Sequence, residues 1–294
     1  MPDRRAFLRT LGAAAVAGKL GQPLAEWREA RHAAKLDRIG LQLYTVRGEM
    51  ERDFDGTLAR VAQVGYTEVE FAGYFDRKPE AVKAALARVG LVAPSAHLSF
   101  EAVRDRWAQT LKDARIVGHR YVVVPWIPVE ERRTADGYKR VAELFNRAGA
   151  EARKAGLRFA YHNHDFEFAA VDDRIPYDVL LAETDPAAVE FEMDLYWVTH
   201  GGGDPLAYFA RHPGRFPLVH VKDMDAARGM VDVGKGVIGW KKIFARRDQA
   251  GIRHYFVEHD QPPDPFASIR ASYEYLKRLE FKCGGPADRR TGGR

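Results

Sequence analysis

The chain has 294 residues, of which 46% are hydrophobic and 30% charged, and it contains a single cysteine. This composition is typical of a folded protein with a substantial core, and it excludes intrinsic disorder and a disulfide-stapled scaffold. The net charge of +5 comes from the ends: residues 1–38 carry +4 and residues 286–294 carry +2, which leaves −1 for the body. We therefore do not expect a basic surface for nucleic acid.

The first 37 residues are interpreted as a targeting segment and linker. Arg4 and Arg5 precede Phe-Leu and a run of small apolar residues at 11–18. That run is too short to cross a bilayer. The pattern resembles a twin-arginine export signal, which the export machinery reads as an address and which does not act as a membrane anchor. We expect a periplasmic protein, and a basic amphipathic helix on a cytoplasmic protein is the alternative.

From Ile39 onward, β-rich runs alternate with segments of helical period. Eight strands are predicted, at Ile39–Tyr44, Thr67–Phe71, Val92–His97, Tyr121–Pro125, Arg158–His162, Val189–Asp194, Leu218–Lys222 and His254–Glu258. Between them, helices are expected at Phe54–Val64, Pro79–Val89, Phe100–Val117 and Gly137–Ala155. Glycines at 65, 90, 118, 156 and 251 follow helical runs, where a left-handed residue ends a helix.

Strands separated by helices form parallel βαβ units, and eight units close into a barrel. The sequence therefore predicts a single-domain α/β protein, a (β/α)8 TIM barrel over residues 38–281, followed by a disordered tail at 282–294. An open doubly wound sheet is the alternative. However, no Gly-x-Gly-x-x-Gly turn follows the first strand.

Chemistry in such a barrel is expected where the strands end and the loops begin. These ends are unusually polar, with candidates at Gln42, Glu70, His97, His162, His164, Asp194, Trp197, His220, Lys222 and Glu258. Burying many ionisable groups is costly unless they have a function. Carboxylates and an imidazole from several strands suit one divalent ion, Mn²⁺, Zn²⁺, Co²⁺ or Mg²⁺. For any single residue, a solvated loop position is the alternative.

Five motifs carry a family resemblance. They are Ile39–Arg47, Tyr161–Glu167, Met193–Trp197, His220–Asp223 and Val257-Glu258. In their order and spacing, the chain from Ile39 to about Leu279 resembles the sugar phosphate isomerase/epimerase family, whose barrel is xylose isomerase-like. The resemblance implies one divalent metal held by the residues that match the family's ligands, here Glu167, Asp194, His220 and Glu258.

One position departs from the family pattern. Many relatives carry the first glutamate at the end of strand five, where this chain has His162, and Glu167 comes five residues later. We prefer Glu167 as the ligand, with His162 in contact with substrate. The alternative makes His162 the ligand, which is chemically acceptable for the same metals.

The resemblance implies a sugar isomerase or epimerase. The metal would bind two neighbouring oxygens of a keto-sugar and stabilise an enediolate, with Glu167 and Glu258 as opposed bases and His162 as a further catalytic group. Gln42, Glu70, His97, His164, Trp197 and Lys222 are expected to contact the substrate, an unphosphorylated small carbohydrate. A homo-oligomer is compatible with the sequence.

Three alternatives remain open at this point. Elimination from the same enediolate would make the protein a dehydratase or lyase acting on a 3-keto-glycoside or an inosose-like compound. A non-catalytic sugar-binding barrel would use the same cavity without metal. A metal-dependent endonuclease of the same superfamily is disfavoured, because the body of the chain lacks a basic surface.

Overall fold

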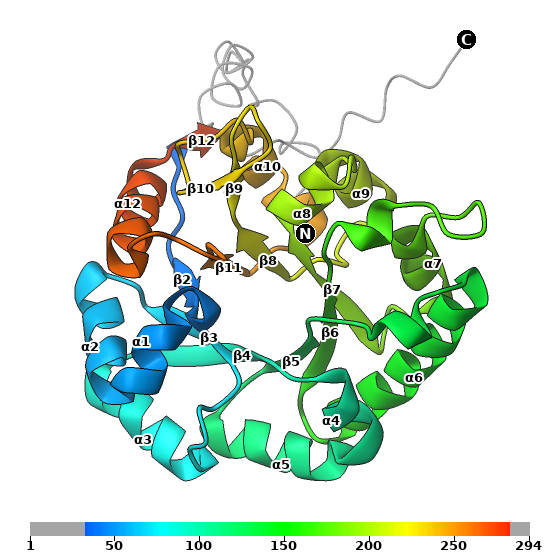
Figure 1. Cartoon of the computed structure of the whole chain (residues 1–294), viewed down its shortest axis with the longest axis horizontal. Coiled ribbons are helices and arrows are strands. Elements are labelled where there is room, and N and C mark those ends of the chain that lie inside the picture. Colours follow the sequence, from blue (N-terminus) through cyan, green and yellow to red (C-terminus); the bar gives the residue numbers. More distant parts are fainter. Residues whose placement is uncertain (1–32, 283–294) are drawn as a thin grey trace, which may run out of the picture. The chain divides into compact units, whose positions relative to one another are not determined.

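The computed structural model describes residues 33–282, and the fold concerns the compact unit that begins at Ala34. Eight parallel strands close into a barrel (Figure 1). In barrel order they are β11 (His254–Val257), β2 (Gly40–Gln42), β3 (Glu68–Ala72), β4 (Val92–His97), β5 (Tyr121–Val124), β6 (Arg158–His162), β7 (Val189–Asp194) and β8 (Leu218–Val221). The predicted TIM barrel is confirmed, and each strand lies within two residues of its expected bounds. Residues 1–32 of the predicted targeting segment and residues 283–294 of the predicted tail lie outside the described residues, and Lys282 belongs to the short strand β12 (Phe281–Lys282).

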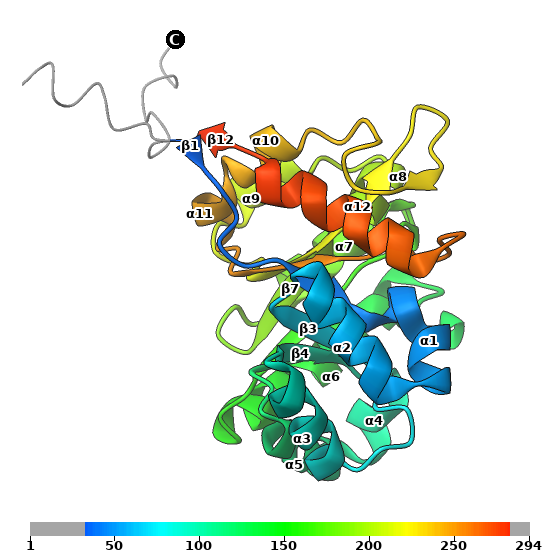
Figure 2. The ribbon, with the colours of Figure 1, turned by 90° about the vertical axis from the view of Figure 1, so that its left-hand side faces the viewer.

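Helices surround the barrel on its outer side (Figures 1 and 2). They are α1 (Arg47–Arg52), α2 (Phe54–Val64), α3 (Pro79–Val89), α4 (Phe100–Asp105), α5 (Trp107–Val117), α6 (Ala135–Lys154), α7 (Pro176–Glu183), α8 (Leu195–His200), α9 (Pro205–Arg211), α10 (Trp240–Phe244), α11 (Arg247–Ala250) and α12 (Pro265–Arg278). Short strands lie at β1 (Ala33–Ala34), β9 (Asp223–Met224), β10 (Met230–Val231) and β12 (Phe281–Lys282). Within residues 33–282, no helix combines the length and apolar character needed to cross a membrane.

Local signals explain where several helices begin and end. The Asp53 side chain accepts the Gly56 N–H at the start of α2, and the helix ends at Gly65, whose φ of 117° suits glycine. The other glycines expected after helices also have positive φ. These residues therefore act as the helix stops that the sequence predicts.

One predicted helix is broken in two. The segment expected as Phe100–Val117 is interrupted at Arg106, where φ is −146° and ψ is 31°. The break turns the Trp107 ring into the core, and its indole N–H donates to the carbonyl oxygen of Ala148 at 3.1 Å. Packing against α6 thus overrides the helical propensity of the segment. The break also leaves Arg106 at the edge of a cavity.

The barrel interior is layered along its axis. A small apolar layer consists of Tyr121, Val123, Ala160, Leu218 and Phe256. Toward the amino ends of the strands, His254 Nδ1 lies 2.8 Å from Glu68 Oε2. Toward the carboxyl ends, the interior becomes polar and buried, and this polar layer forms the floor of the candidate site. The outward strand residues pack against the helices in a separate, larger core.

A buried carboxylate organises the loop after β8. Asp223 accepts the backbone N–H groups of Met224, Gly234, Gly236 and Ile238 at 2.8–3.3 Å and the indole N–H of Trp240 at 2.9 Å. A Cβ atom on Gly236 would lie 2.2 Å from Asp223 Oδ1, so the close approach requires glycine. The Gly234-Lys235-Gly236 segment therefore serves a turn around Asp223.

We expect Asp223→Ala to lower the free energy of unfolding by about 3 kcal/mol or more, because it leaves several buried donors without an acceptor. Urea unfolding followed by circular dichroism measures this loss. Asp225→Ala is the matched control, since within residues 33–282 the Asp225 side chain accepts a single backbone N–H, that of Gly229. Equal losses in the two variants would contradict the role given to Asp223.

Candidate active site

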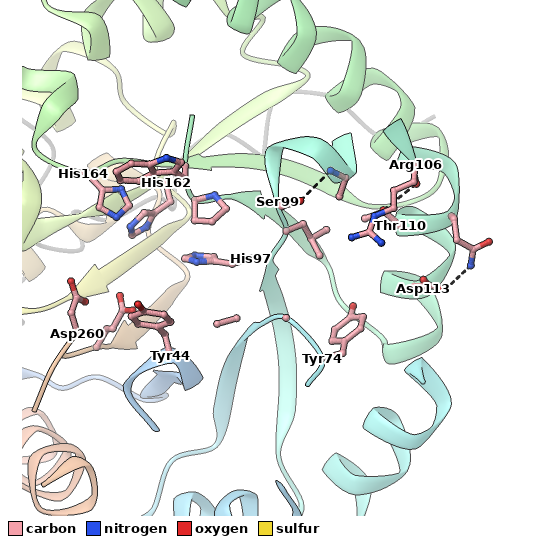
Figure 3. Close-up of a pocket in the computed structure, with 18 of the residues that line it drawn as sticks. Tyr44, Tyr74, His97, Ser99, Arg106, Thr110, Asp113, His162, His164 and Asp260 are labelled. Atoms are coloured by element: carbon pink, nitrogen blue, oxygen red, sulfur yellow. Dashed lines mark hydrogen bonds between the residues drawn. The ribbon is translucent and has the colours of Figure 1, made fainter. Parts of the chain in front are cut away.

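A cavity of about 660 Å³ opens at the carboxyl ends of the strands (Figure 3). Ionisable side chains from strand ends and the loops that follow line one end of it: His97, His162, His164, Lys222, Glu258 and Asp260. Two aromatic rings of the lining, Tyr44 and Trp126, are 41% and 43% exposed. Exposed rings beside a polar cavity are suited to packing against the C–H face of a sugar.

Two groups of metal-binding side chains meet at this end. The first, here called the imidazole cluster, consists of His97, His162, Glu192 and His220. The second, the carboxylate cluster, consists of Asp194, His220 and Glu258. Within each cluster the donor atoms lie within 4.8 Å of one another. His220 belongs to both, because its Nδ1 lies 2.7 Å from Glu258 Oε2 and its Nε2 lies 3.2 Å from Glu192 Oε2.

Strand geometry accounts for this convergence. Successive side chains of a strand point to opposite faces, so residues two apart share the barrel interior. Glu192 and Asp194 are such a pair on β7, and His220 and Lys222 are another at the end of β8. Parallel register then brings the pairs together, since Asp194 lies opposite His220 across the β7–β8 ladder.

Lys222 is the buried cation of the carboxylate cluster. Its Nζ lies 3.0 Å from Asp194 Oδ2, 2.7 Å from Glu258 Oε2 and 2.8 Å from Asp260 Oδ1. Burial alone would lower the pKa of Lys222, but the surrounding carboxylates outweigh it and hold the pKa well above its usual value. Burial would likewise raise the pKa of Glu258, and the charges of Lys222 and His220 instead hold it well below the usual range. Both groups are therefore charged near neutral pH.

The imidazoles fall into two protonation classes. For His97, the carboxylates of Glu70 and Glu192 outweigh the opposing effect of burial and raise the pKa to about 9. For His162, burial and the neighbouring cationic rings lower the pKa well below its usual value. Burial, with Lys222 adding to it, also lowers the pKa of His164, to about 3. A protonated and a neutral imidazole thus lie side by side, with the His97 and His162 ring centroids 5.0 Å apart.

The donor set fits a divalent metal ion. Imidazole nitrogens and carboxylate oxygens are ligands of Zn²⁺, Mn²⁺ and Co²⁺, and the carboxylates also suit Mg²⁺. Two buried carboxylate oxygens, Glu192 Oε1 and Asp194 Oδ2, make no hydrogen bond in the described part of the chain. Lys222 Nζ is close to Asp194 Oδ2 without the angles of a hydrogen bond. Such oxygens are available to a cation.

Most of the sequence-predicted residues lie at or beneath this end of the cavity. Asp194, His220 and Glu258 form one cluster, and His162 Nε2 lies 3.7 Å from Asp194 Oδ2. His97, His164 and Lys222 line the cavity directly.

Three predicted substrate contacts lie behind the cavity wall. Gln42 Nε2 donates to Glu70 Oε2 at 2.7 Å, and the same oxygen lies 2.7 Å from His220 Nε2, so this pair supports the imidazoles from below. Trp197 packs beside His164, with ring centroids 5.7 Å apart. Gln42, Glu70 and Trp197 are not among the residues that line the cavity within the described chain.

The position of Glu167 requires a correction. Its carboxylate accepts the hydroxyl of Tyr161 and the backbone N–H of His164, the latter at 2.9 Å, and belongs to neither cluster. The reason is the alternation of β6, which turns His162 inward and Tyr161 outward toward α6. The short helical turn at Phe166–Phe168 then carries Glu167 to the Tyr161 side. Glu167 is therefore not positioned as a metal ligand or as a base opposite Glu258.

Glu167 should instead make stability depend on pH. Burial raises the pKa of Glu167 to about 7, because its effect is larger than that of the hydrogen bonds, which lower the pKa. As pH rises from about 4.5 to 7, the unfolded chain loses this proton and the folded chain keeps it, so stability falls by up to about 3 kcal/mol. Glu167→Gln should remove that fall. Urea unfolding at pH 5 and pH 8 tests this expectation.

The control for this experiment is Glu151→Gln, an exposed glutamate on α6. The gain of Glu167→Gln over wild type should be larger at pH 8 than at pH 5, and Glu151→Gln should show no such difference. A gain of equal size at both pH values would contradict the titration of Glu167.

Two residues of the site lie at polar strand ends but were given no role from the sequence. Glu192 bridges His97 and His220, and Asp260 faces Lys222. A signal was present for both, because Glu192 precedes Asp194 by two residues and Asp260 follows Glu258 by two. Residues two apart in a strand share one face, so this spacing alone would have added both to the candidates.

Fold and site together define a (β/α)8 barrel with metal-binding side chains at the carboxyl ends of its strands, where barrel enzymes carry their chemistry. The chain belongs to the xylose isomerase-like TIM barrel family, whose model matches residues 58–279. The family membership agrees with the resemblance seen in the strand-end motifs.

Known relatives carry two kinds of names. An inosose dehydratase of Geobacillus thermodenitrificans is 25% identical over 276 residues, covering 80% of this chain and 91% of the relative. An inosose dehydratase of Clostridium beijerinckii is 23% identical over 269 residues, covering 77% and 90%. A sugar phosphate isomerase/epimerase structure from Parabacteroides distasonis is 30% identical with a TM-score of 0.73, covering 82% of this chain and 98% of that one.

Proposed function

We propose that the protein is a divalent-metal-dependent dehydratase or lyase. Its substrate would be a cyclic keto-sugar or an inosose-like compound that loses a proton beside the carbonyl and an oxygen substituent from the next carbon. The observation that carries this proposal is the pair of adjacent imidazoles, His97 and His162, at one end of the cavity. The inosose dehydratases among the relatives support the same reaction class.

Elimination and epimerisation require different arrangements of acid and base. Epimerisation by two bases needs proton-transfer groups on opposite faces of the substrate carbon. The carboxylate expected opposite Glu258 is Glu167, which bonds Tyr161 and His164 outside the cavity. A base and an acid on one side of the cavity instead suit removal of a proton and protonation of a leaving oxygen.

The carboxylate cluster of Asp194, His220 and Glu258 would hold the metal ion. Its bound ion would supply Lewis acidity toward the carbonyl oxygen of the substrate. These three residues follow one another on β7, β8 and the end of β11, so the barrel itself sets their spacing.

His162, His97 and Lys222 have roles in the proposed reaction. Neutral His162 takes the proton from the carbon beside the carbonyl, and the C–H electron pair forms the new C=C bond. The adjacent C–O bond breaks, and protonated His97 gives its proton to the departing oxygen as water or an alcohol. Lys222 places its positive charge where negative charge develops on the substrate oxygen. Exchange with solvent then restores the proton of His97 and removes that of His162.

A sugar epimerase or isomerase is the second candidate. It is favoured by the similarity to the Parabacteroides distasonis isomerase/epimerase structure. The same first proton transfer would begin that reaction, and the proton would return to carbon instead of an oxygen leaving.

Proton NMR in D₂O, with purified protein supplied with Mn²⁺, Co²⁺, Zn²⁺ or Mg²⁺, separates these candidates. The substrates are an inosose, one-ring keto-sugars and keto-glycosides. We expect loss of water or alcohol and a new unsaturated ketone signal. Deuterium entry at carbon without elimination would overturn the lyase in favour of the epimerase. Neither change with any metal would overturn both and leave a sugar-binding barrel.

A further inference from the structure

The cavity extends well beyond the reacting groups. Its other end is lined by polar residues of the loop after β3 and of α4, α5 and their junctions: Tyr74, Ser99, Arg106, Gln109, Thr110 and Asp113. Figure 3 shows Arg106, Thr110 and Asp113 on the side away from His162, His164 and Asp260, with Tyr74 nearer to that side than to the histidines. We call this region the distal end of the cavity.

Tyr74 is held in place at the distal end by a buried histidine. His119 is 5% exposed, and its Nδ1 lies 2.7 Å from the carbonyl oxygen of Ala93. That carbonyl can only accept, so Nδ1 carries the hydrogen and Nε2 is the acceptor. The Tyr74 hydroxyl, 2.9 Å from Nε2, therefore donates to His119. Its oxygen lone pairs remain available, and the ring stacks on His119 at an interplanar angle of 20°.

The rest of the distal end contains hydrogen-bond donors and acceptors, together with one positively and one negatively charged side chain. Gln109 Nε2 donates to Asp113 Oδ1 at 2.7 Å, and the Thr110 hydroxyl donates to the carbonyl oxygen of Arg106 at 3.1 Å. The Arg106 guanidinium forms no ion pair with any residue from 33 to 282. The Asp113 carboxylate in the same wall disfavours a phosphate, because like charges repel. Hydroxyl groups, which both donate and accept, match such a wall.

The volume of the cavity also exceeds what one sugar ring needs. At about 660 Å³ it lies within the range of roughly 300–1,000 Å³ that holds drug-sized ligands, and a single hexose fills only a minor part of such a space. A ring placed at His97 and His162 would leave the distal end for a further group of the same molecule.

We propose that the distal end binds a second sugar ring, so that the protein acts on glycosides of at least two rings. This inference rests on the proposed function, because it places the reacting ring at the imidazoles. Tyr74 would be the platform for the second ring, and Arg106, Gln109 and Asp113 would bind its hydroxyls. The break between α4 and α5 is the structural feature that delivers Arg106 to this position.

Binding of unreactive sugars tests the distal end independently of turnover. Cellobiose, maltose and methyl β-D-glucoside are titrated into Mn²⁺-supplied protein by calorimetry. At least one disaccharide should bind about tenfold or more tightly than methyl glucoside. Arg106→Ala should remove most of that gain and leave methyl glucoside binding unchanged. Arg115→Ala is the matched control, an exposed arginine on α5 that does not line this cavity and should keep the gain.

The outcomes separate the distal end from the proposed function. Equal affinities for methyl glucoside and the disaccharides would overturn the proposal that the distal end binds a second ring. A gain in disaccharide affinity that survives both Arg106→Ala and Tyr74→Ala would overturn it too. Either result would hold even if one-ring keto-sugars are converted. A disaccharide gain that Arg106→Ala removes supports the distal end even if no substrate reacts, in which case the proposed function alone fails. Absence of binding by every one of these sugars would also overturn the proposal for the distal end, and the proposed function would then be judged by the NMR experiment alone.

Discussion

Glu258→Gln should lower kcat/KM by about 10³-fold or more and remove the bound metal from the purified protein. Glu258 Oε2 lies 2.7 Å from both His220 Nδ1 and Lys222 Nζ, so the negative charge of Glu258 stabilises both of these neighbouring cationic groups. A neutral amide of the same shape loses that charge and is a poor ligand for a divalent ion. Metal content by mass spectrometry and steady-state kinetics measure the two effects.

The control for Glu258→Gln is the same change at Glu190. Glu190 lies on β7 at the opposite end of the strand, where it pairs with Arg158. Glu190→Gln should keep metal and activity. If metal is lost from Glu192→Gln and retained in Glu258→Gln, the ion belongs to the imidazole cluster and the assignment to the carboxylate cluster is wrong.

Lys222→Met should lower kcat by about 10²- to 10³-fold while the protein still binds its metal. The ammonium group is no ligand, and its removal takes away positive charge where the substrate oxygen becomes negative. It also removes a cation that lies 3.0 Å from Asp194 Oδ2, so metal affinity should be maintained or increased. Rapid-mixing kinetics under saturating metal and metal titration by calorimetry give the two quantities.

A structural effect of this variant must be separated from a chemical one. Removing one partner of a buried ion pair can cost about 3–5 kcal/mol of stability. Unfolding is therefore measured in parallel, and Lys222→Arg is the companion variant because it keeps the charge. Recovery of part of kcat in Lys222→Arg supports the electrostatic role. Unchanged kcat in a folded Lys222→Met would contradict it.

Much of the barrel could be predicted from the sequence, because the hydrophobic periods of strands and helices depend on residues that are close together in the chain. The runs Tyr121–Val124 and Leu218–Val221 have the mostly apolar character of buried parallel strands, and glycines such as Gly65 mark the helix ends. The strand-end motifs that carry the family resemblance pointed to Asp194, His220 and Glu258, and these three residues lie together in the structure. Periodicity and helix-end signals are local properties of the chain, so they can be recognised without knowing the tertiary structure.

Contacts between distant segments could not be read in this way. Glu167 was predicted as a metal ligand from its place in the chain. In the structure its carboxylate accepts a hydrogen bond from the hydroxyl of Tyr161, which faces outward from the barrel. The helix break at Arg106 depends on Trp107 reaching Ala148, a residue 41 positions away. No pattern within the segment itself contains that information.

The amino-acid sequence was sufficient for the barrel, for the strand bounds to within two residues and for several of the inward strand-end residues, since each depends on periodicity along the chain. Folding in three dimensions selected which of those residues meet: His220 joins Glu70, Glu192 and Glu258 across the interior, and Lys222 gathers three carboxylates. The physical reason is that charge and hydrogen bonding act over a few ångströms, and the register of eight strands decides which groups come that close.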